Sequence, residues 1–214
     1  MSKEPEFLLA LDVSSATIGI ALFEDLGDRG ELKLLHHVSP KVKPQPDNKM
    51  EELFKKVEIF ETEFLSKYAD FGITTVVIEE PLLQSNNVYT VATLLRFNGM
   101  ISKSVYDTLG VVPDFISSYD ARKYAFSELM AVRKFKKDGT PIDEKTIAKA
   151  KPVLFGDYAF DVDKKAVLLE KVSEIYPKII WLYDKKNKLK KESFDMSDSV
   201  VAGFGFMHKN GKWK

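Results

Sequence analysis

The sequence predicts an α/β protein built on a mixed five-stranded sheet that is flanked by helices. Two observations lead to this prediction. Three strand-like segments come first, and helix-like and strand-like segments then alternate before the chain closes in helices. The chain has 214 residues, of which 44% are apolar and 30% charged, as in a globular protein able to bury a core. We expect a single domain over residues 1–214.

The first three strands are expected to pair antiparallel. Phe7–Asp12 and Ile18–Phe23 are apolar runs with a short connection that contains a Ser-Ser pair, which predicts a β-hairpin. Glu31–Val38 alternates well enough between polar and apolar residues to form a third strand. From Lys49 to Tyr68 the apolar residues recur at helical spacing, so a helix follows the three strands.

The rest of the sheet comes from two further strands. Thr74–Ile78 is β-branched and apolar, as is typical of a buried central strand. Val111–Ile116 is interrupted by Pro113, which favours an edge position. The other predicted helices are Val88–Leu109, Asp120–Met130, Asp161–Ile175 and Asp195–His208, the last weakened by Gly203 and Gly205. Residues 131–160 mix Lys, Gly and Pro with isolated aromatics and are expected to form an insertion or mobile arm with a basic run.

Four acidic residues stand at the ends of these elements. Asp12 ends the first strand and Glu79 ends the central strand. Asp195 and Asp198 begin the last predicted helix three residues apart, so their side chains share one face. An acid at the end of an apolar strand is costly to bury unless it is paired or binds a metal. If the two strands are neighbours, their carboxylates repel each other and call for a cation.

Carboxylates without Cys or His favour Mg²⁺ over zinc. The chain contains no Cys, which excludes disulfides and Cys-based zinc sites. A pair of Mg²⁺ ions about 3.5–4 Å apart can clamp the attacking and leaving oxygens of a phosphodiester. Simpler interpretations stay open, because Asp195 suits a helix N-cap, Asp198 a first helical turn and Asp12 a hairpin turn. Strand alternation lets only one of Glu79 and Glu80 face the site, and we favour Glu79.

The charge distribution is more informative than the net charge. The 32 basic and 32 acidic residues cancel, which argues weakly against a nucleic-acid partner. Basic residues nevertheless gather in two runs, Arg133–Lys137 and Lys185–Lys191. Each run is either a solvated loop or a set of phosphate contacts. The candidate DNA-binding residues in these runs are Lys134, Lys136 and Lys137, and then Lys186, Lys188 and Lys190.

The three acidic motifs together resemble those of the RuvC-type Holliday junction resolvases, a family that includes phage-type members. The opening motif of that family is similar to Leu9–Ser15 followed by Ile18–Ala21, in which a strand ending in Asp turns into a strand containing Gly. Its second motif, a Glu directly after an apolar strand, resembles Val77–Pro81. Its closing Asp-x-x-Asp motif resembles Asp195–Ala202, and a stretch of its second helix that ends in Gly is similar to Arg96–Gly99.

The resemblance implies an RNase H-like fold of the retroviral-integrase superfamily and a crossover junction endodeoxyribonuclease. Such an enzyme is a structure-selective nuclease of DNA recombination and repair, which acts on Holliday junctions or other branched DNA. The resemblance implies two Mg²⁺ ions per active site, for which Mn²⁺ substitutes. Asp12 would be shared by both ions, Glu79 would hold one, and Asp195 and Asp198 would hold the other. A homodimer is also implied, since two symmetric nicks need two sites related by a two-fold axis.

The resemblance covers residues 7 to about 128 and 161 to 208. It also implies site-facing or DNA-facing roles for Lys123 and for Lys164 or its neighbour Lys165. The family often has an aromatic residue shortly after the Glu, whereas this chain has Pro81, Leu82 and Leu83. Tyr89 is a candidate to take the place of that aromatic residue, although its position favours burial in the core under a helix. Segment 131–160 also looks longer than the connection usual in the family.

Other functions fit parts of the same pattern. An RNase H-like enzyme that cuts RNA–DNA hybrids or flaps would need the same acids. An actin-like or sugar-kinase-like ATPase also opens with an Asp-tipped strand and hairpin, but it needs a duplicated half and Gly-rich nucleotide loops. A non-catalytic scaffold would have no reason to keep all four acids.

The start of the chain carries no targeting signal that we recognise. Met1–Phe7 contains Lys3, Glu4 and Glu6 and lacks the apolar run of a signal peptide. No stretch approaches the roughly 20 apolar residues of a membrane span. We therefore expect a cytoplasmic protein without a membrane partner, and the family resemblance implies a bacterium or a phage-infected host.

Overall fold

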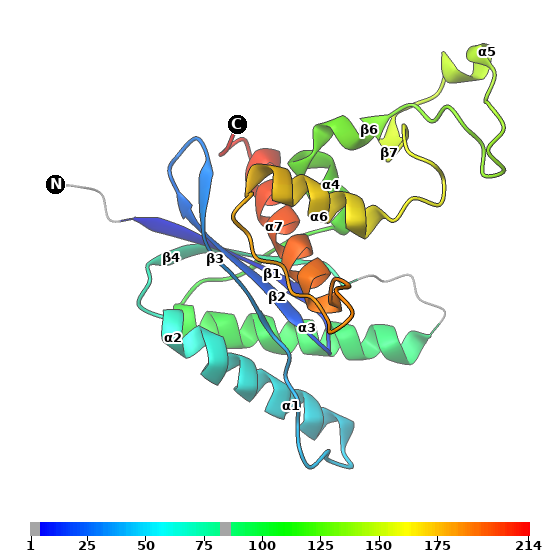
Figure 1. The fold of residues 1–214 in the computed structure, drawn as a ribbon. Coiled ribbons are helices and arrows are strands. Elements are labelled where there is room, and N and C mark those ends of the chain that lie inside the picture. The colour runs from blue at the N-terminus through cyan, green and yellow to red at the C-terminus, as the bar shows by residue number, and fades with distance from the viewer. Residues whose placement is uncertain (1–4, 82–86) are drawn as a thin grey trace.

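A computed structural model describes residues 5–81 and 87–214, and the chain folds there around a mixed five-stranded sheet (Figure 1). The strands are β1 (Glu6–Val13), β2 (Ile18–Asp25), β3 (Gly30–Val38), β4 (Ile73–Glu79) and β5 (Asp114–Ile116). Their order across the sheet is β3-β2-β1-β4-β5. The first three strands pair antiparallel, and β4 and β5 run parallel to β1. The predicted sheet is therefore confirmed, including the edge position of the fifth strand.

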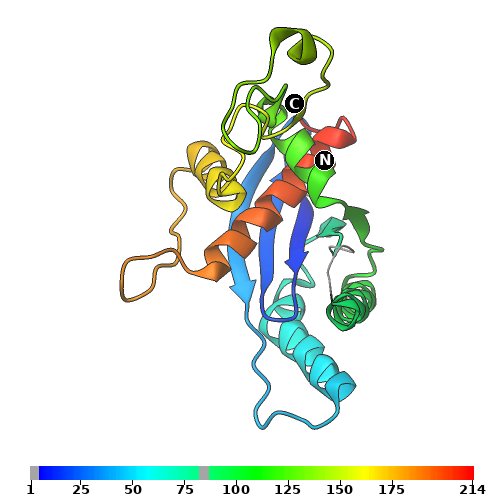
Figure 2. The ribbon, with the colours of Figure 1, turned by 90° about the vertical axis from the view of Figure 1, so that its right-hand side faces the viewer.

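Helices cover both faces of the sheet (Figures 1 and 2). One face is covered by α1 (Lys49–Phe60) and α3 (Val88–Leu109), and the other by α4 (Ser118–Ala125), α6 (Lys164–Ile175) and α7 (Lys191–Lys209). Successive side chains of a strand point to opposite faces. Leu9 and Leu11 of β1 accordingly belong to the core under α1 and α3, whereas Leu8 and Ala10 belong to the core under α7.

The core under α1 and α3 is rich in aromatic side chains. Phe60, Phe64 and Phe97 are fully buried there, and each such burial stabilises the fold by roughly 1.5–3 kcal/mol. The helical run predicted over Lys49–Tyr68 is present. It consists of α1, a π-helical turn η1 (Glu61–Leu65) and the short helix α2 (Ser66–Tyr68). Asn48 caps its start, since its side chain accepts hydrogen bonds from the Met50 and Glu51 amides.

Helix α7 differs from its prediction in where it begins. It starts at Lys191, about one turn before Asp195, so Asp195 is not its N-cap. Gly203 and Gly205 do not break it. A Cβ atom at Gly203 would crowd Phe23 of β2, and one at Gly205 would overlap the backbone of Ala121 in α4. The glycines therefore let α7 lie close against the sheet and α4, and this packing outweighs their low helix propensity.

The helix predicted over Asp120–Met130 was wrong in both boundaries. Ser117 caps the helix start, so that α4 covers Ser118–Ala125, and a 3₁₀ turn η2 (Ser127–Leu129) follows. Phe126 leaves the helical conformation (φ −136°, ψ 78°) and is buried, as is Leu129. Burial of these two apolar side chains thus sets the end of α4 in a way that helical periodicity does not reveal.

Residues 131–160 form a projection that leaves the sheet at one end (Figure 2). Strand β6 (Met130–Ala131) pairs antiparallel with β7 (Val153–Leu154) at its base, and the single-turn helix α5 (Glu144–Ile147) lies within it. Helix α6 begins at Lys164 rather than at the predicted Asp161, with Asp163 as its N-cap. Among the helices in the described ranges, none has the length and apolar character needed to cross a membrane.

Candidate active site

The four acids that the sequence singles out lie in one pocket. Asp12, Glu79, Asp195 and Asp198 all line a cavity of about 270 Å³. Asp12 comes from the end of β1, Glu79 from the end of the neighbouring strand β4, and the two others from α7. Residues that lie up to 186 positions apart in the sequence therefore meet at one edge of the sheet.

Strand alternation explains why Asp12 and Glu79 face α7. Asp12 follows Leu8 and Ala10 at two-residue steps on the α7 face of the sheet. Glu79 likewise stands two residues after Val77, which contacts that same core, whereas Val76 and Ile78 belong to the opposite face. The parallel pairing of β1 with β4 then brings both strand ends to one place.

Gly19 brings the third element into position. It lies opposite Asp12 in the antiparallel pairing of β1 with β2. A Cβ atom at this position would overlap the backbone carbonyl of Asp195. The absence of a side chain therefore lets the backbone of α7 cross β2 in direct contact, which places Asp195 beside Asp12.

The β1–β2 turn beside Asp12 is held from two sides. Ser14 Oγ donates a hydrogen bond to the Thr17 carbonyl (2.9 Å) and accepts one from the Thr17 amide (3.1 Å). Lys56 Nζ of α1 donates to the Ser15 carbonyl (2.8 Å) and pairs with the buried Glu52 carboxylate (2.7 Å). Hydrogen bonds from Lys49 and then Lys56 lower the pKa of Glu52 to about 2, so this anchor stays charged at neutral pH.

The pocket carries an excess of negative charge. Burial, and then the charges of Glu79, Asp198 and Asp195, raise the pKa of Asp12 well above its usual value. Burial and the Asp198 charge raise the pKa of Glu79 to about 8. Burial also raises the pKa of Asp195, although Lys165 and Lys191 oppose the shift. Such shifts are expected where carboxylates gather without enough cations.

Three basic side chains line the same pocket, and they come from Arg122, Lys165 and Lys191. Lys165 Nζ lies 2.8 Å from Asp198 Oδ2 and 3.7 Å from Asp195 Oδ1. Burial lowers the pKa of Lys165, but the charge of Asp198 and the hydrogen bond to it outweigh this effect and raise the pKa. Arg122 acts mainly on Glu79, whose pKa it lowers. The site thus combines four carboxylates with three cations.

The donor set suits a hard divalent cation. Asp195 Oδ2 is buried and finds no hydrogen-bond partner among the described residues, and a buried carboxylate oxygen without a partner is costly. Across residues 5–81 and 87–214, however, no three His, Asp or Glu side chains already surround one point as ligands. Repulsion keeps uncompensated carboxylates apart, and the Lys165 ammonium already neutralises Asp198. The site therefore suits a divalent cation in the type of its ligands and in their presence in one pocket, although the side chains do not yet surround a single point.

Glu80, the alternative to Glu79, has a different environment. Its side chain is exposed at the rim of the pocket, and its backbone amide donates to the Ile116 carbonyl of β5 (2.8 Å). Its charge contributes to raising the pKa of Lys209 rather than those of the other acids. Glu79 is instead coupled electrostatically to Asp12 and Asp198.

Of the lysines that the sequence places near the site, Lys123 and Lys164 do not line the acidic pocket. Lys123 Nζ lies over the ring of Tyr124, and Lys164 Nζ lies near the ring of Phe155. Their neighbours Arg122 and Lys165 line the pocket instead. The sequence analysis gave Lys165 as an alternative to Lys164 and did not name Arg122. Helical side chains three or four residues apart share a face, and this spacing is the signal that could have identified Arg122.

The predicted DNA contacts of the first basic run lie on the projection formed by residues 131–160. Lys134 pairs there with Asp157 (2.9 Å), and Lys137 Nζ lies 6.0 Å from the ring centre of Phe160. Lys136 is exposed. None of the three reaches the acidic pocket.

The aromatic substitute considered for the region after Glu79 lies on the surface. Tyr89 is 86% exposed at the start of α3, so its assignment to a helix core was wrong. It lines a shallow cavity of about 260 Å³ together with Ser15 and Leu94, and Leu94 also lines the acidic pocket. Pro81 lines the acidic pocket, whereas Leu82 and Leu83 lie outside the described residues.

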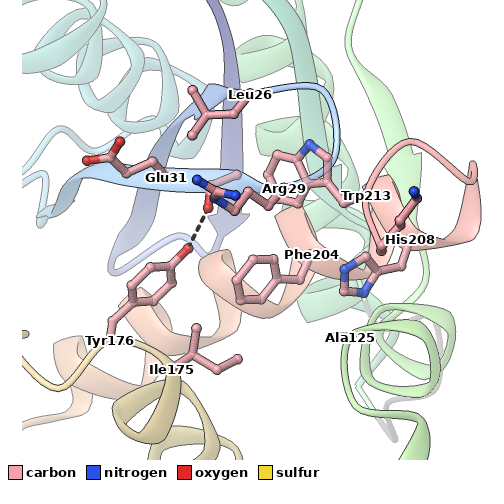
Figure 3. A pocket seen from close by; sticks show the side chains of 11 residues that line it. Leu26, Arg29, Glu31, Ala125, Ile175, Tyr176, Phe204, His208 and Trp213 are labelled. Atoms are coloured by element: carbon pink, nitrogen blue, oxygen red, sulfur yellow. Dashed lines mark hydrogen bonds between the residues drawn. The ribbon is translucent and has the colours of Figure 1, made fainter.

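A larger cavity of about 460 Å³ lies at the opposite end of α7 (Figure 3). Phe204, Tyr176 and Trp213 contribute aromatic walls, and the Tyr176 hydroxyl donates to the Gly30 carbonyl (3.1 Å). None of the four acids lines this cavity. Its size therefore does not make it the candidate active site, because the convergent carboxylates lie elsewhere.

Two solved structures share this fold over nearly the full chain. A structure of Thermus thermophilus RuvC has a TM-score of 0.53 at 13% identity and covers 96% of this chain and 97% of that chain. T. thermophilus RuvC in complex with a Holliday junction substrate has a TM-score of 0.56 at 10% identity and covers 97% of each chain. No family model and no curated protein sequence matches the chain. The chain therefore shares the RNase H-like fold of T. thermophilus RuvC.

Proposed function

We propose that the protein is a divalent-metal-dependent endonuclease that cuts branched DNA, with Asp12, Glu79, Asp195 and Asp198 as its metal ligands. The observation that carries the proposal is the meeting of these carboxylates from three elements, with raised pKa values at three of them. Ions held there would supply the Lewis acidity that phosphodiester hydrolysis requires. Mg²⁺ suits an all-carboxylate donor set, and Mn²⁺ is a suitable substitute.

The cations of the pocket would bind the scissile phosphate. Lys165 has a side chain that is 46% exposed, so its ammonium can turn from Asp198 toward a phosphate oxygen. Arg122 stands on the Glu79 side of the pocket and offers a planar guanidinium suited to two phosphate oxygens. A fixed positive charge beside the phosphate stabilises the negative charge that develops in the transition state.

A branched substrate is favoured over plain duplex by two observations. The RuvC complex that shares this fold was solved with a Holliday junction substrate. The projection formed by residues 131–160 and the exposed Tyr89, which lines a separate cavity, can contact different parts of a branched molecule. Two symmetric nicks would require two copies of the site, so we also propose that the active form is a homodimer.

The test is a panel of end-labelled substrates: four-way junction, fork, duplex and RNA–DNA hybrid, each with Mg²⁺, with Mn²⁺ and with chelator. We expect metal-dependent cleavage that is fastest on the four-way junction. Asp12→Asn should lower the rate by several orders of magnitude and leave junction binding intact, because it removes one ligand charge and relieves repulsion of the phosphate. Preferred cleavage of the hybrid would redirect the proposal to an RNase H activity, and full cleavage in chelator would refute it.

A further inference from the structure

The second basic run of the sequence forms a compact hairpin next to the acidic pocket. Residues 184–191 carry five Lys and one Asp, a net charge of +4 in a chain whose total is zero. Tyr183 and Leu189 form an antiparallel bridge across this hairpin, which we define as residues 183–190. In Figure 2 it projects beside the N-terminal end of α7, and the projection of residues 131–160 leaves elsewhere.

The hairpin is locally ordered by its single acid. The Asp184 carboxylate accepts hydrogen bonds from the backbone amides of Lys186 (2.8 Å) and Lys188 (2.9 Å). The Asp184 amide donates to the Lys188 carbonyl (2.8 Å), and Asn187 takes a left-handed conformation (φ 57°) that Asn tolerates. The carboxylate is therefore engaged with the backbone rather than with an ammonium group.

The lysines of the hairpin are left without partners. Within the described part of the chain, the side chains of Lys185, Lys186, Lys188 and Lys190 make no hydrogen bond or ion pair. All four are exposed. Some lysines elsewhere, such as Lys33 and Lys171, lie beside a Glu. Four unpaired ammonium groups within six residues repel one another, so this arrangement has no evident stabilising role.

The stem of the hairpin is fixed to the helices that build the site. Trp181 is buried, and its Nε1 donates to Ser173 Oγ of α6 (2.9 Å). The buried Ser193 of α7 accepts a hydrogen bond from the Leu182 amide (2.8 Å) and donates one to its carbonyl (3.1 Å). Lys191, directly after the hairpin, lines the acidic pocket. The stem of the hairpin that carries these lysines is thus anchored beside the acidic pocket.

We propose that hairpin 183–190 is a phosphate-binding element for the DNA strand that passes through the acidic pocket. The proposal rests on the proposed nuclease function and specifies how this site holds its substrate. The cations inside the pocket serve the scissile phosphate, so the neighbouring phosphates of the strand need positive charge from outside the pocket. Unpaired lysines on an anchored hairpin, one residue from the pocket wall, supply that charge without assigning sequence preference.

Charge-matched variants test the proposal in the full chain. The variant Lys185→Gln/Lys186→Gln/Lys188→Gln removes three positive charges from the hairpin. The control Lys67→Gln/Lys178→Gln/Lys212→Gln removes the same charge from exposed positions that line neither the hairpin nor the acidic pocket. Affinity for a labelled four-way junction in Ca²⁺ is measured against salt concentration. Each phosphate that the protein no longer neutralises lowers the log-log slope by about 0.9, so the slope should fall by about 2–3 units for the hairpin variant and much less for the control.

A single introduced cysteine gives a second, independent readout, because the chain contains no other Cys. An iron chelate attached to Lys186→Cys should cut the junction backbone within a few nucleotides of the scissile phosphate. The same chelate on Lys67→Cys should give no localised cuts. Equal salt slopes for both triple variants, or chelate cuts no closer to the scissile phosphate from position 186 than from position 67, would overturn the proposal.

The two proposals fail in different ways. If the unmodified protein neither binds nor cleaves any DNA of the panel, the nuclease function fails and the hairpin proposal fails with it. If the unmodified protein cleaves the junction but the hairpin variants behave like the controls, only the hairpin proposal fails.

Discussion

Single residues determine the chemistry of the pocket through strand alternation. Asp12 and Glu79 reach the pocket because each stands two residues after an apolar residue of the α7 face, Ala10 and Val77 respectively. The motif-based choice of Glu79 over Glu80 has the same physical origin. The carboxylate that faces its like-charged neighbours shows a raised pKa, and the adjacent Glu80 lies at the exposed rim.

The pair Glu79→Gln and Glu80→Gln tests this assignment. Each substitution keeps the size of the side chain and removes one charge. We expect Glu79→Gln to lower the rate of metal-dependent junction cleavage by at least about 100-fold, since loss of a site residue that acts on the transition state costs several kcal/mol. Glu80→Gln should stay within a few-fold of the unmodified protein. Single-turnover rates at saturating Mg²⁺ measure both, and a larger loss for Glu80→Gln would contradict the assignment.

The raised pKa values also predict how stability depends on pH without metal. The pKa of Glu79 is about 8 in the folded chain and near 4.5 when unfolded, and that of Asp12 shifts in the same direction. The folded state therefore binds more protons than the unfolded state in this range. The contribution of these two carboxyl groups to folding stability is thus greatest below about pH 5 and falls as the pH rises toward 8. In chelator, Asp12→Asn should raise the Tm at pH 9 and change it less at pH 6.

Thermal unfolding followed by circular dichroism measures this effect. In a chain of this size, a change of 1 kcal/mol in the free energy of unfolding shifts the Tm by roughly 2–4 °C. Asp28→Asn, at an exposed position in the β2–β3 turn, is the control and should leave the Tm unchanged at both pH values. A Tm for Asp12→Asn below that of the unmodified protein at pH 9 would show that repulsion among the carboxylates does not destabilise the fold.

The sequence identified the acids but not all of their basic neighbours. Strand ends and the Asp-x-x-Asp spacing are local signals, so Asp12, Glu79, Asp195 and Asp198 could be named without a structure. Which basic residue of a helix faces the pocket depends on how that helix is rotated against the sheet. Helical rotation is set by tertiary packing, and for this reason Arg122 was missed.

At the scale of elements, close packing of α7 against the sheet controls the geometry of the site. Helix α7 contributes two of the four acids, and glycines stand at two places where it meets another backbone closely, at Gly19 of β2 and at its own Gly205. Helix propensity alone treats Gly203 and Gly205 as defects. Their neighbours Phe23 and Ala121 show that they are contact points.

The variant Gly19→Ala tests this role. Its Cβ atom would overlap the Asp195 carbonyl, so α7 must shift, at a cost of about 1–3 kcal/mol, and carry Asp195 away from Asp12. We expect a folded but less stable protein whose cleavage rate falls more than its junction affinity. Gly99→Ala in α3 is the matched control, since a Cβ there meets no atom within 4 Å and Ala favours a helix. Normal cleavage by Gly19→Ala would refute the positioning role.

Element boundaries were the least predictable part of the fold. The periodic helix over Val88–Leu109 and the five strands were predicted within a few residues. The boundaries of α4 and α7 were not predicted this closely. Helix α4 ends at the buried Phe126, and α7 begins before its acids, in a segment that Ser193 anchors. Both ends depend on contacts with distant segments.

At the scale of the whole molecule, zero net charge conceals an uneven surface. Acids converge in one pocket, and unpaired lysines gather on hairpin 183–190, while further lysines lie on the projection of residues 131–160. The mixed sheet and the antiparallel pairing of its first three strands were predicted from the order of the elements, whereas the strand order β3-β2-β1-β4-β5 was not. The surface arrangement could not be predicted, because it depends on how long insertions fold back on the sheet.

The projection of residues 131–160 gives a prediction of its own. Replacing Lys134, Lys136 and Lys137 with Ala should weaken junction binding and lower the salt slope by roughly one unit for each phosphate that these side chains neutralise. Stability should change by no more than about 0.5 kcal/mol, since the three side chains lie on the surface. Electrophoretic mobility shift at several salt concentrations measures the slope. An unchanged slope would leave the projection without a DNA-binding role.

The central claim is that the four carboxylates hold catalytic divalent ions, and crystals grown with Mn²⁺ test it most directly. Anomalous scattering locates Mn²⁺ without reference to any assumed substrate. We predict anomalous peaks within about 2.0–2.4 Å of carboxylate oxygens of Asp12, Glu79, Asp195 and Asp198, and their loss in Asp12→Asn. Peaks only at other acidic positions, or an empty pocket at millimolar Mn²⁺ with a junction bound, would contradict the account.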